Sequence, residues 1–170
     1  MTITAEDRRH LDRCVELAAQ AVDVGDEPFG SVLVAADGTV LFEDHNHVSG
    51  GDGTRHPELA IALWAAANVA PGERSAMTVY TSGEHCAMCS AAHAWAGLGR
   101  IVFATSTPQL LQWLEELGVL GASPVAPLQI TQVAPGVPVD GPVEEYADRV
   151  RALHARHHGA GPSAEVGQRD

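Results

Sequence analysis

Hydrophobic and polar positions alternate along the first quarter of the chain with two different periods. Residues 4–23 place apolar side chains at helical spacing on one face. Residues 31–36 and 39–44 are instead two short runs rich in β-forming residues, and Asp37-Gly38 lies between them. An Asp-Gly pair between two such runs is a strong β-hairpin signal. The pattern therefore predicts a helix followed by a hairpin.

The rest of the chain alternates helical segments with single short strands. The pattern predicts, in order, a helix over 56–70, a strand over 77–82, a helix over 86–98, a strand over 100–106, a helix over 108–119, an edge strand over 127–131 and a helix over 143–158. Such alternation requires right-handed crossovers between parallel strands. It predicts an α/β fold whose sheet is largely parallel and covered on both faces, and the hairpin makes that sheet mixed.

Length and composition favour one domain, over residues 1–158, followed by a small polar tail over 159–170 that we expect to be disordered. A chain of 170 residues with 45% hydrophobic residues can bury a sizeable core. No apolar run reaches the roughly 18 residues that indicate a membrane span. The charged N-terminal segment lacks the apolar core of a signal peptide, so the default expectation is a cytoplasmic protein.

The charge balance is strongly acidic, with a formal net charge of -12 and ten basic residues that are all arginine. Phosphate backbones are bound by clustered Lys and Arg, and the sequence has no basic run. Nucleic acid is therefore disfavoured as a partner, and a small-molecule substrate is expected. The odd count of three cysteines disfavours a disulfide framework, and Cys14 is expected to pack in the core.

The chemistry concentrates in His56-Pro57-Glu58 and in the Cys-x-x-Cys of Cys86 and Cys89. Two cysteines at i and i+3 share a helix face, and a helix start favours thiolates. Together with His56 they supply three zinc ligands, which leaves one coordination position open for a water molecule whose pKa the metal lowers to about 7. Glu58, two residues from His56, is then the candidate that carries the proton of that water.

Three other interpretations of these residues are open. The Cys-x-x-Cys pair is also typical of a redox-active dithiol, although that leaves His-x-Glu unexplained. A closed structural zinc site needs a fourth ligand, which His85 or His93 would supply. A zinc-stabilised module that binds partners without catalysis would have such a closed site.

The segment from Pro28 to Ser106 resembles the cytidine/deoxycytidylate deaminase superfamily, nearest the branch of guanine deaminase and tRNA adenosine deaminase. The segments that carry the resemblance are PFGSVLVAADG (28–38), Asn46, HPE (56–58), VYTSGEHCAMC (79–89) and AWAGLGRIVFATS (94–106). The resemblance implies a three-layer α/β/α sandwich around a five-stranded mixed sheet. It also implies one Zn²⁺ per chain and a homodimer or higher oligomer.

The resemblance also implies a role for each matching residue. It assigns His56, Cys86 and Cys89 to zinc and Glu58 to proton transfer, as in the His-x-Glu and Cys-x-x-Cys motifs of zinc nucleobase deaminases. It places four further residues at the substrate pocket: Asn46, Phe29, Pro57 and Trp95. Each has a plainer alternative, because Asn46 can cap a turn and Phe29 or Trp95 can belong to the core.

The sequence departs from the family pattern at three places. His85 stands where the family usually has Pro and adds a titratable group that is a candidate for substrate contact. Pro57 stands where Ala is common. The chain after Ser106 lacks the acidic segment of guanine deaminases. Neither of the first two changes removes a reacting group, whereas the third bears on the substrate.

We therefore expect a zinc-dependent hydrolytic deaminase that acts on a free nucleobase or a related amino-heterocycle, with a guanine-like base favoured and a role in purine metabolism. The alternatives are cytosine or a nucleoside such as cytidine or adenosine; the acidic charge disfavours tRNA adenosine. In the resembling family the C-terminal region reaches a neighbouring subunit's pocket. Here Glu144, Glu145 and Tyr146 are candidates for that contact, or form a solvated helix start.

Overall fold

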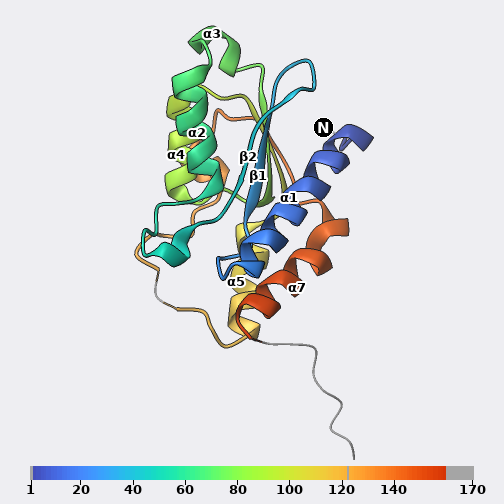
Figure 1. The fold of residues 1–170 in the computed structure, drawn as a ribbon, viewed down its shortest axis with the longest axis vertical. Helices are drawn as coiled ribbons and strands as arrows, with labels where there is room; N and C mark the ends of the chain where they lie inside the picture. The colour runs from blue at the N-terminus through green and yellow to red at the C-terminus, as the bar shows by residue number, and fades with distance from the viewer. Residues whose placement is uncertain (1, 122, 160–170) are drawn as a thin grey trace, which may run out of the picture.

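A five-stranded mixed sheet forms the middle layer of the computed structural model, which describes residues 2–121 and 123–159 (Figure 1). The strands are β1 (Gly30–Val34), β2 (Val40–His45), β3 (Thr78–Gly83), β4 (Arg100–Thr105) and β5 (Val139–Asp140). They lie in the order β2-β1-β3-β4-β5. Strand β1 is antiparallel to both β2 and β3, whereas β3, β4 and β5 are parallel to one another.

Helices cover both faces of this sheet (Figure 1). They are α1 (Ala5–Asp23), α2 (Pro57–Asn68), α3 (Pro71–Arg74), α4 (Ala87–Ala96), α5 (Thr107–Glu116), α6 (Ile130–Val133) and α7 (Ala147–His157). Helices α2 and α4 pack on one face, and α1 and α7 lie on the other. This architecture confirms the predicted three-layer α/β/α fold.

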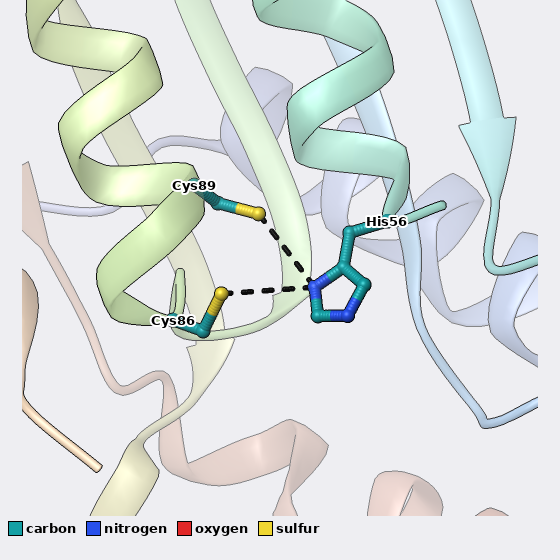
Figure 2. Close-up of side chains that lie close together, drawn as sticks. All are labelled: His56, Cys86 and Cys89. Atoms are coloured by element: carbon teal, nitrogen blue, oxygen red, sulfur yellow. Dashed lines mark hydrogen bonds between the residues drawn. The ribbon is translucent and has the colours of Figure 1, made fainter. Parts of the chain in front are cut away.

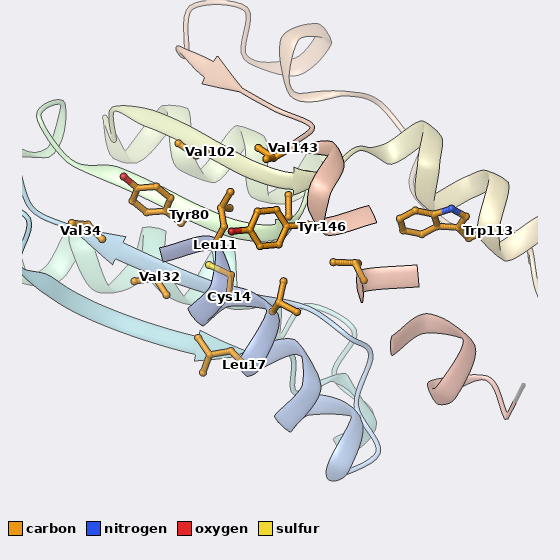
Figure 3. Packing of buried hydrophobic residues seen from close by; sticks show 13 residues of the cluster. Leu11, Cys14, Leu17, Val32, Val34, Tyr80, Val102, Trp113, Val143 and Tyr146 are labelled. Atoms are coloured by element: carbon orange, nitrogen blue, oxygen red, sulfur yellow. The ribbon is translucent and has the colours of Figure 1, made fainter. Parts of the chain in front are cut away.

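Local sequence signals explain where α1 and the hairpin form. Thr4 caps α1 because its hydroxyl accepts a hydrogen bond from the Asp7 backbone N–H, while the Asp7 carboxylate accepts one from the Thr4 backbone N–H. The apolar face of the helix enters the core, where Cys14 is fully buried as predicted (Figure 3). Gly38 has a φ of 88°, which suits the predicted turn between β1 and β2.

The predicted edge strand over 127–131 is wrong. The Ile130 backbone N–H donates to the Glu84 carboxylate at 3.0 Å, and the chain there turns into the short helix α6. The edge strand is formed later, where Val139 pairs with Ile101 of β4. A single buried apolar residue, Ile130, anchors this segment, so it has no alternating pattern to hold it in the sheet.

The C-terminal helix packs on its own chain through Tyr146. This side chain is 2% exposed, and its hydroxyl donates to the Arg8 carbonyl at 3.0 Å (Figure 3). Glu145 pairs with the Arg8 guanidinium at 2.8 Å, whereas Glu144 is exposed. Tyr146 is therefore a core residue of its own chain, and neither alternative offered for it, a contact with a neighbouring pocket or a solvated helix start, describes it.

Residues 160–170 of the predicted tail lie outside the described residues. Within the described part of the chain, no helix combines the length and apolar character that a membrane span requires.

A buried ionic network ties α1 to β4 and β5. Asp7 accepts hydrogen bonds from Tyr80 at 2.9 Å and from Arg100 at 2.8 Å, and Arg100 also pairs with Asp140 at 2.7 Å. Burial alone raises the pKa of Asp7, but hydrogen bonds from Thr4, Arg100 and Tyr80 outweigh it and lower that pKa to about 2. Asp7 is therefore ionised in the core at neutral pH.

Candidate metal centre

Two helix starts bring one imidazole and two thiols together on the same side of the sheet (Figure 2). His56 is the N-cap residue of α2, Cys86 is the N-cap residue of α4, and Cys89 lies in the first turn of α4. The His56 Nδ1 atom lies 3.7 Å from the Cys86 Sγ and 3.6 Å from the Cys89 Sγ. The predicted ligands thus converge although 30 residues separate His56 from Cys86.

These separations fit zinc. Bonds of about 2.3 Å to sulfur and 2.0–2.1 Å to nitrogen place neighbouring tetrahedral ligands roughly 3.6 Å apart. The Cys89 hydrogen bond, aided by His56, lowers the pKa of the Cys86 thiol to about 4, whereas the same bond and burial raise the pKa of Cys89. One thiolate is therefore already favoured without a metal, and a divalent cation supplies the charge that favours the second.

Glu58 sits directly beside this triad. Its side chain is buried, and its Oε1 accepts hydrogen bonds from Ser31 Oγ at 3.0 Å and Thr81 Oγ1 at 2.8 Å. Its Oε2 lies 3.8 Å from the Cys89 Sγ. Burial raises the pKa of Glu58 despite the opposing effect of the nearby His56. One carboxylate oxygen is thus fixed by hydroxyl groups, while the other faces the ligand cluster.

Ser31 and Thr81 are functional residues that the sequence analysis missed. Both are fully buried, Ser31 among the apolar residues of β1 and Thr81 beside the buried Ser82 in β3. A polar residue inside a short buried strand is the signal that would have found them, because a buried hydroxyl needs a partner.

The predicted pocket residues Asn46 and Phe29 lie next to one another. The Asn46 backbone N–H donates to the Phe29 carbonyl at 3.0 Å. Asn46 is fully buried, and its Oδ1 accepts from the Val48 backbone N–H at 2.9 Å. Its Nδ2 has no hydrogen-bond partner among the described residues. The Asn46 side chain therefore caps a turn and also retains a buried donor that a ligand can satisfy.

The Phe29 ring lies close to Gly83, at the end of β3 and three residues before Cys86. A Cβ added at Gly83 would stand 2.9 Å from the ring, so only glycine leaves room for it. The Phe29 ring also contacts His154 of α7 edge-on, with ring centroids 5.4 Å apart. His154 was also missed by the sequence analysis, in which it is one of several histidines on an amphipathic helix.

The structure buries two of the remaining predicted residues, Pro57 and His85, and exposes the third, Trp95. Pro57 is buried in the first turn of α2 between His56 and Glu58. Trp95 is 91% exposed near the end of α4, so it neither packs in the core nor lines the site of its own chain. His85 is buried beside His93, and neither of its ring nitrogens has a hydrogen-bond partner among the described residues.

The geometry bears on the alternative of a closed structural zinc site. Among the described residues, His56, Cys86 and Cys89 form a group whose ligand atoms lie within 4.8 Å of one another, and neither His85 nor His93 joins it. Three strong ligands beside a buried carboxylate match the open zinc sites of hydrolases. The fold and the site together define a zinc-dependent hydrolase.

The chain belongs to the cytidine and deoxycytidylate deaminase family, whose zinc-binding region matches residues 4–105. It is 32% identical over 117 residues to a probable cytosine deaminase of Schizosaccharomyces pombe, a match that covers 68% of this chain and 70% of that protein. It is 34% identical over 96 residues to guanine deaminase of Bacillus subtilis, covering 55% and 61%. The family and its relatives establish a hydrolytic C–N deaminase of the zinc nucleobase type.

The solved structure of a guanine deaminase from Nitrosomonas europaea has the same fold. It superposes with a TM-score of 0.67 at 19% sequence identity, covering 93% of this chain and 86% of that one. The shared fold therefore extends beyond the zinc-binding region into the C-terminal part of the described chain.

Proposed function

We propose that the protein is a cytoplasmic aminohydrolase of purine metabolism that converts the exocyclic amine of a free, guanine-like nucleobase to a carbonyl and releases ammonia. The observation that carries this proposal is the buried Glu58 carboxylate beside the convergent His56, Cys86 and Cys89 ligand atoms. In this assignment the three ligands hold Zn²⁺ and Glu58 is the acid/base.

Zinc, when bound, supplies Lewis-acid activation of a water molecule at its open position. Glu58 would accept one proton of that water at Oε2 and pass it to a ring nitrogen, and would then take the second proton from the hydroxyl on the attacked ring carbon and pass it to the departing amine. The raised pKa of the buried carboxyl suits it to this proton transfer. Ser31 and Thr81 hold Oε1 and so fix the direction of Oε2. The balance is one water consumed and one ammonia released.

Asn46 and Phe29 are assigned to substrate binding. The unpaired Nδ2 donor of Asn46 would satisfy a ring nitrogen or carbonyl of the base. The Phe29 ring lies close to Gly83 and contacts the His154 ring. It would provide an apolar surface for a planar heterocycle. Pro57 forms the backbone between the ligand and the acid/base and stiffens it.

Two observations support a free base as substrate over a nucleic acid. Relatives of this chain are named as deaminases of cytosine and of guanine. The net charge of -12 opposes binding to a phosphate backbone. Cytosine is the second candidate, because the probable cytosine deaminase matches over 117 residues.

A panel of substrates tests the proposal. The zinc-loaded protein should release ammonia from guanine faster than from cytosine, adenine or their nucleosides, with aminated triazines and pterins as further probes. Glu58→Gln should retain zinc and lose turnover, whereas Cys86→Ser should lose zinc. Near-normal turnover by Glu58→Gln would remove the proposed acid/base, and a preference for cytosine would replace the guanine assignment by the second candidate.

The proposal includes a homodimer formed through α2 and α4. Their outer surface exposes Leu63 at 63% and Trp95 at 91%, and both side chains are large and apolar. Light scattering should show a dimer for the natural protein and a monomer for Trp95→Glu. Val24→Glu, at an apolar residue 65% exposed after α1, is the matched control and should remain dimeric.

A further inference from the structure

A second group of metal-ligating side chains lies apart from the cysteine-containing centre. Asp26 is in the connection between α1 and β1, His45 ends β2, and His47 follows two residues later. One ligand atom from each of the three lies within 4.8 Å of the other two. Asp26 is 4% exposed, and the two imidazole rings are half-buried with centroids 4.3 Å apart.

The hydrogen bonds around the two rings fix which nitrogen of each is free. His45 Nδ1 lies 2.8 Å from the Asn46 carbonyl oxygen, and His47 Nε2 lies 2.8 Å from Asp44 Oδ1. A carbonyl or carboxylate oxygen only accepts, so each of these nitrogens carries the proton and donates it. The opposite nitrogens, Nε2 of His45 and Nδ1 of His47, therefore present lone pairs.

Metal-binding histidines in proteins have hydrogen bonds of this kind around them. Such histidines donate their second ring N–H to a backbone carbonyl or a carboxylate, which sets the tautomer and the ring orientation. The Asp26 carboxylate is also held in place, because its Oδ1 accepts the Ser49 backbone N–H at 2.6 Å and the Ser49 side chain hydrogen-bonds to it as well. The carboxylates of Asp26 and Asp44 together balance the charge of a divalent ion.

We propose that Asp26, His45 and His47 bind a second divalent transition-metal ion through two imidazole nitrogens and one carboxylate oxygen. This donor set suits Zn²⁺, Ni²⁺ or Cu²⁺ better than Mg²⁺, which prefers oxygen ligands. The site has no thiolate, so its ion exchanges more readily than one held by Cys86 and Cys89.

The position of this site connects it to the substrate pocket. His45 and His47 directly flank Asn46, and Asp26 belongs to a different segment that leads to Phe29. A bound ion therefore ties the segment before β1 to the segment after β2 and holds the Asn46 turn. In this role, which rests on the proposed function, the second ion holds Asn46 and Phe29, the residues assigned to the base, in fixed positions.

Calorimetric titration of tag-free protein that already holds one zinc per chain tests the site. Added Zn²⁺ should bind at one further ion per chain, and Mg²⁺ should give no binding. The double variant His45→Ala/His47→Ala should lose this second ion and keep the first. Asp44→Ala, which removes the acceptor of the His47 ring N–H and of the His45 backbone N–H, should weaken it about 10–100-fold. The double variant His157→Gln/His158→Gln, at a neighbouring imidazole pair elsewhere, is the control and should bind both ions.

Amide hydrogen exchange gives an independent readout. The second ion should slow exchange at Val48 and Ser49, whose N–H groups donate to Asn46 and Asp26, and should leave the His45→Ala/His47→Ala variant unchanged. A single zinc per chain in the natural protein, or a second ion retained by that variant, would overturn the proposal. These measurements count bound ions and follow amide exchange, and neither depends on whether any base is deaminated. A failure of this proposal can therefore be told apart from a failure of the proposed function.

Discussion

Asp7→Asn should remove a pH-dependent part of the stability that links α1 to the sheet. Asp7 is 2% exposed, and its hydrogen bonds lower its pKa to about 2, from 3.8 for an unperturbed carboxyl. The difference, 3.8 − 2 = 1.8 units, corresponds to about 2.4 kcal/mol at 1.36 kcal/mol per unit. Because the folded-state pKa is the lower one, this stability is present above pH 3.8 and is lost as the pH falls towards 2.

Urea unfolding at pH 6 and pH 3 measures this contribution. At pH 3 roughly half of it, about 1.1 kcal/mol, should already be lost in the natural protein, because the unfolded carboxyl is by then mostly protonated while the folded one is still mostly ionised. The stability gap between the natural protein and Asp7→Asn should therefore narrow by about that amount from pH 6 to pH 3. Asp12→Asn, at an exposed partner of Arg149, is the control and should cost under about 1 kcal/mol at both values. A gap for Asp7→Asn that is constant with pH would refute the reasoning.

Three further changes test the site and the core. Ser31→Ala removes a hydroxyl that donates to the Glu58 carboxylate, so kcat should fall about 10–100-fold. The zinc content, measured by metal analysis, should be unchanged, and an unaltered kcat would exclude a positioning role for Ser31. Gly83→Ala places a methyl group 2.9 Å from the Phe29 ring, so the free energy of unfolding should fall by about 1–3 kcal/mol. Phe29→Leu in the same chain should restore part of this loss, and no recovery would show that the loss does not come from contact with the Phe29 ring. Tyr146→Phe should cost about 1 kcal/mol in thermal or urea unfolding because its hydroxyl donates to a backbone carbonyl of α1, and a neutral result would show that the carbonyl finds another donor.

The order of helices and strands was accessible from the sequence because most elements carry strong local signals. The Asp-Gly turn, the Thr4 cap, the proline at the first position of α2 and the helical face of residues 4–23 each act within a few residues. The candidate ligands were accessible for a different reason. Thiol, imidazole and carboxylate groups at these spacings have few chemical uses, so their types limit the site before any coordinates are known.

Only the tertiary structure decided which residues meet across the sheet. The hydroxyls of Ser31 and Thr81 orient Glu58 from separate strands, and no spacing in the sequence relates them to it. The exposure of Trp95 likewise depends on how α4 packs on its neighbours, because a residue on an apolar helix faces the core or the solvent according to that packing alone. The sequence determined the chemistry available to this protein, and long-range packing determined which groups share one site.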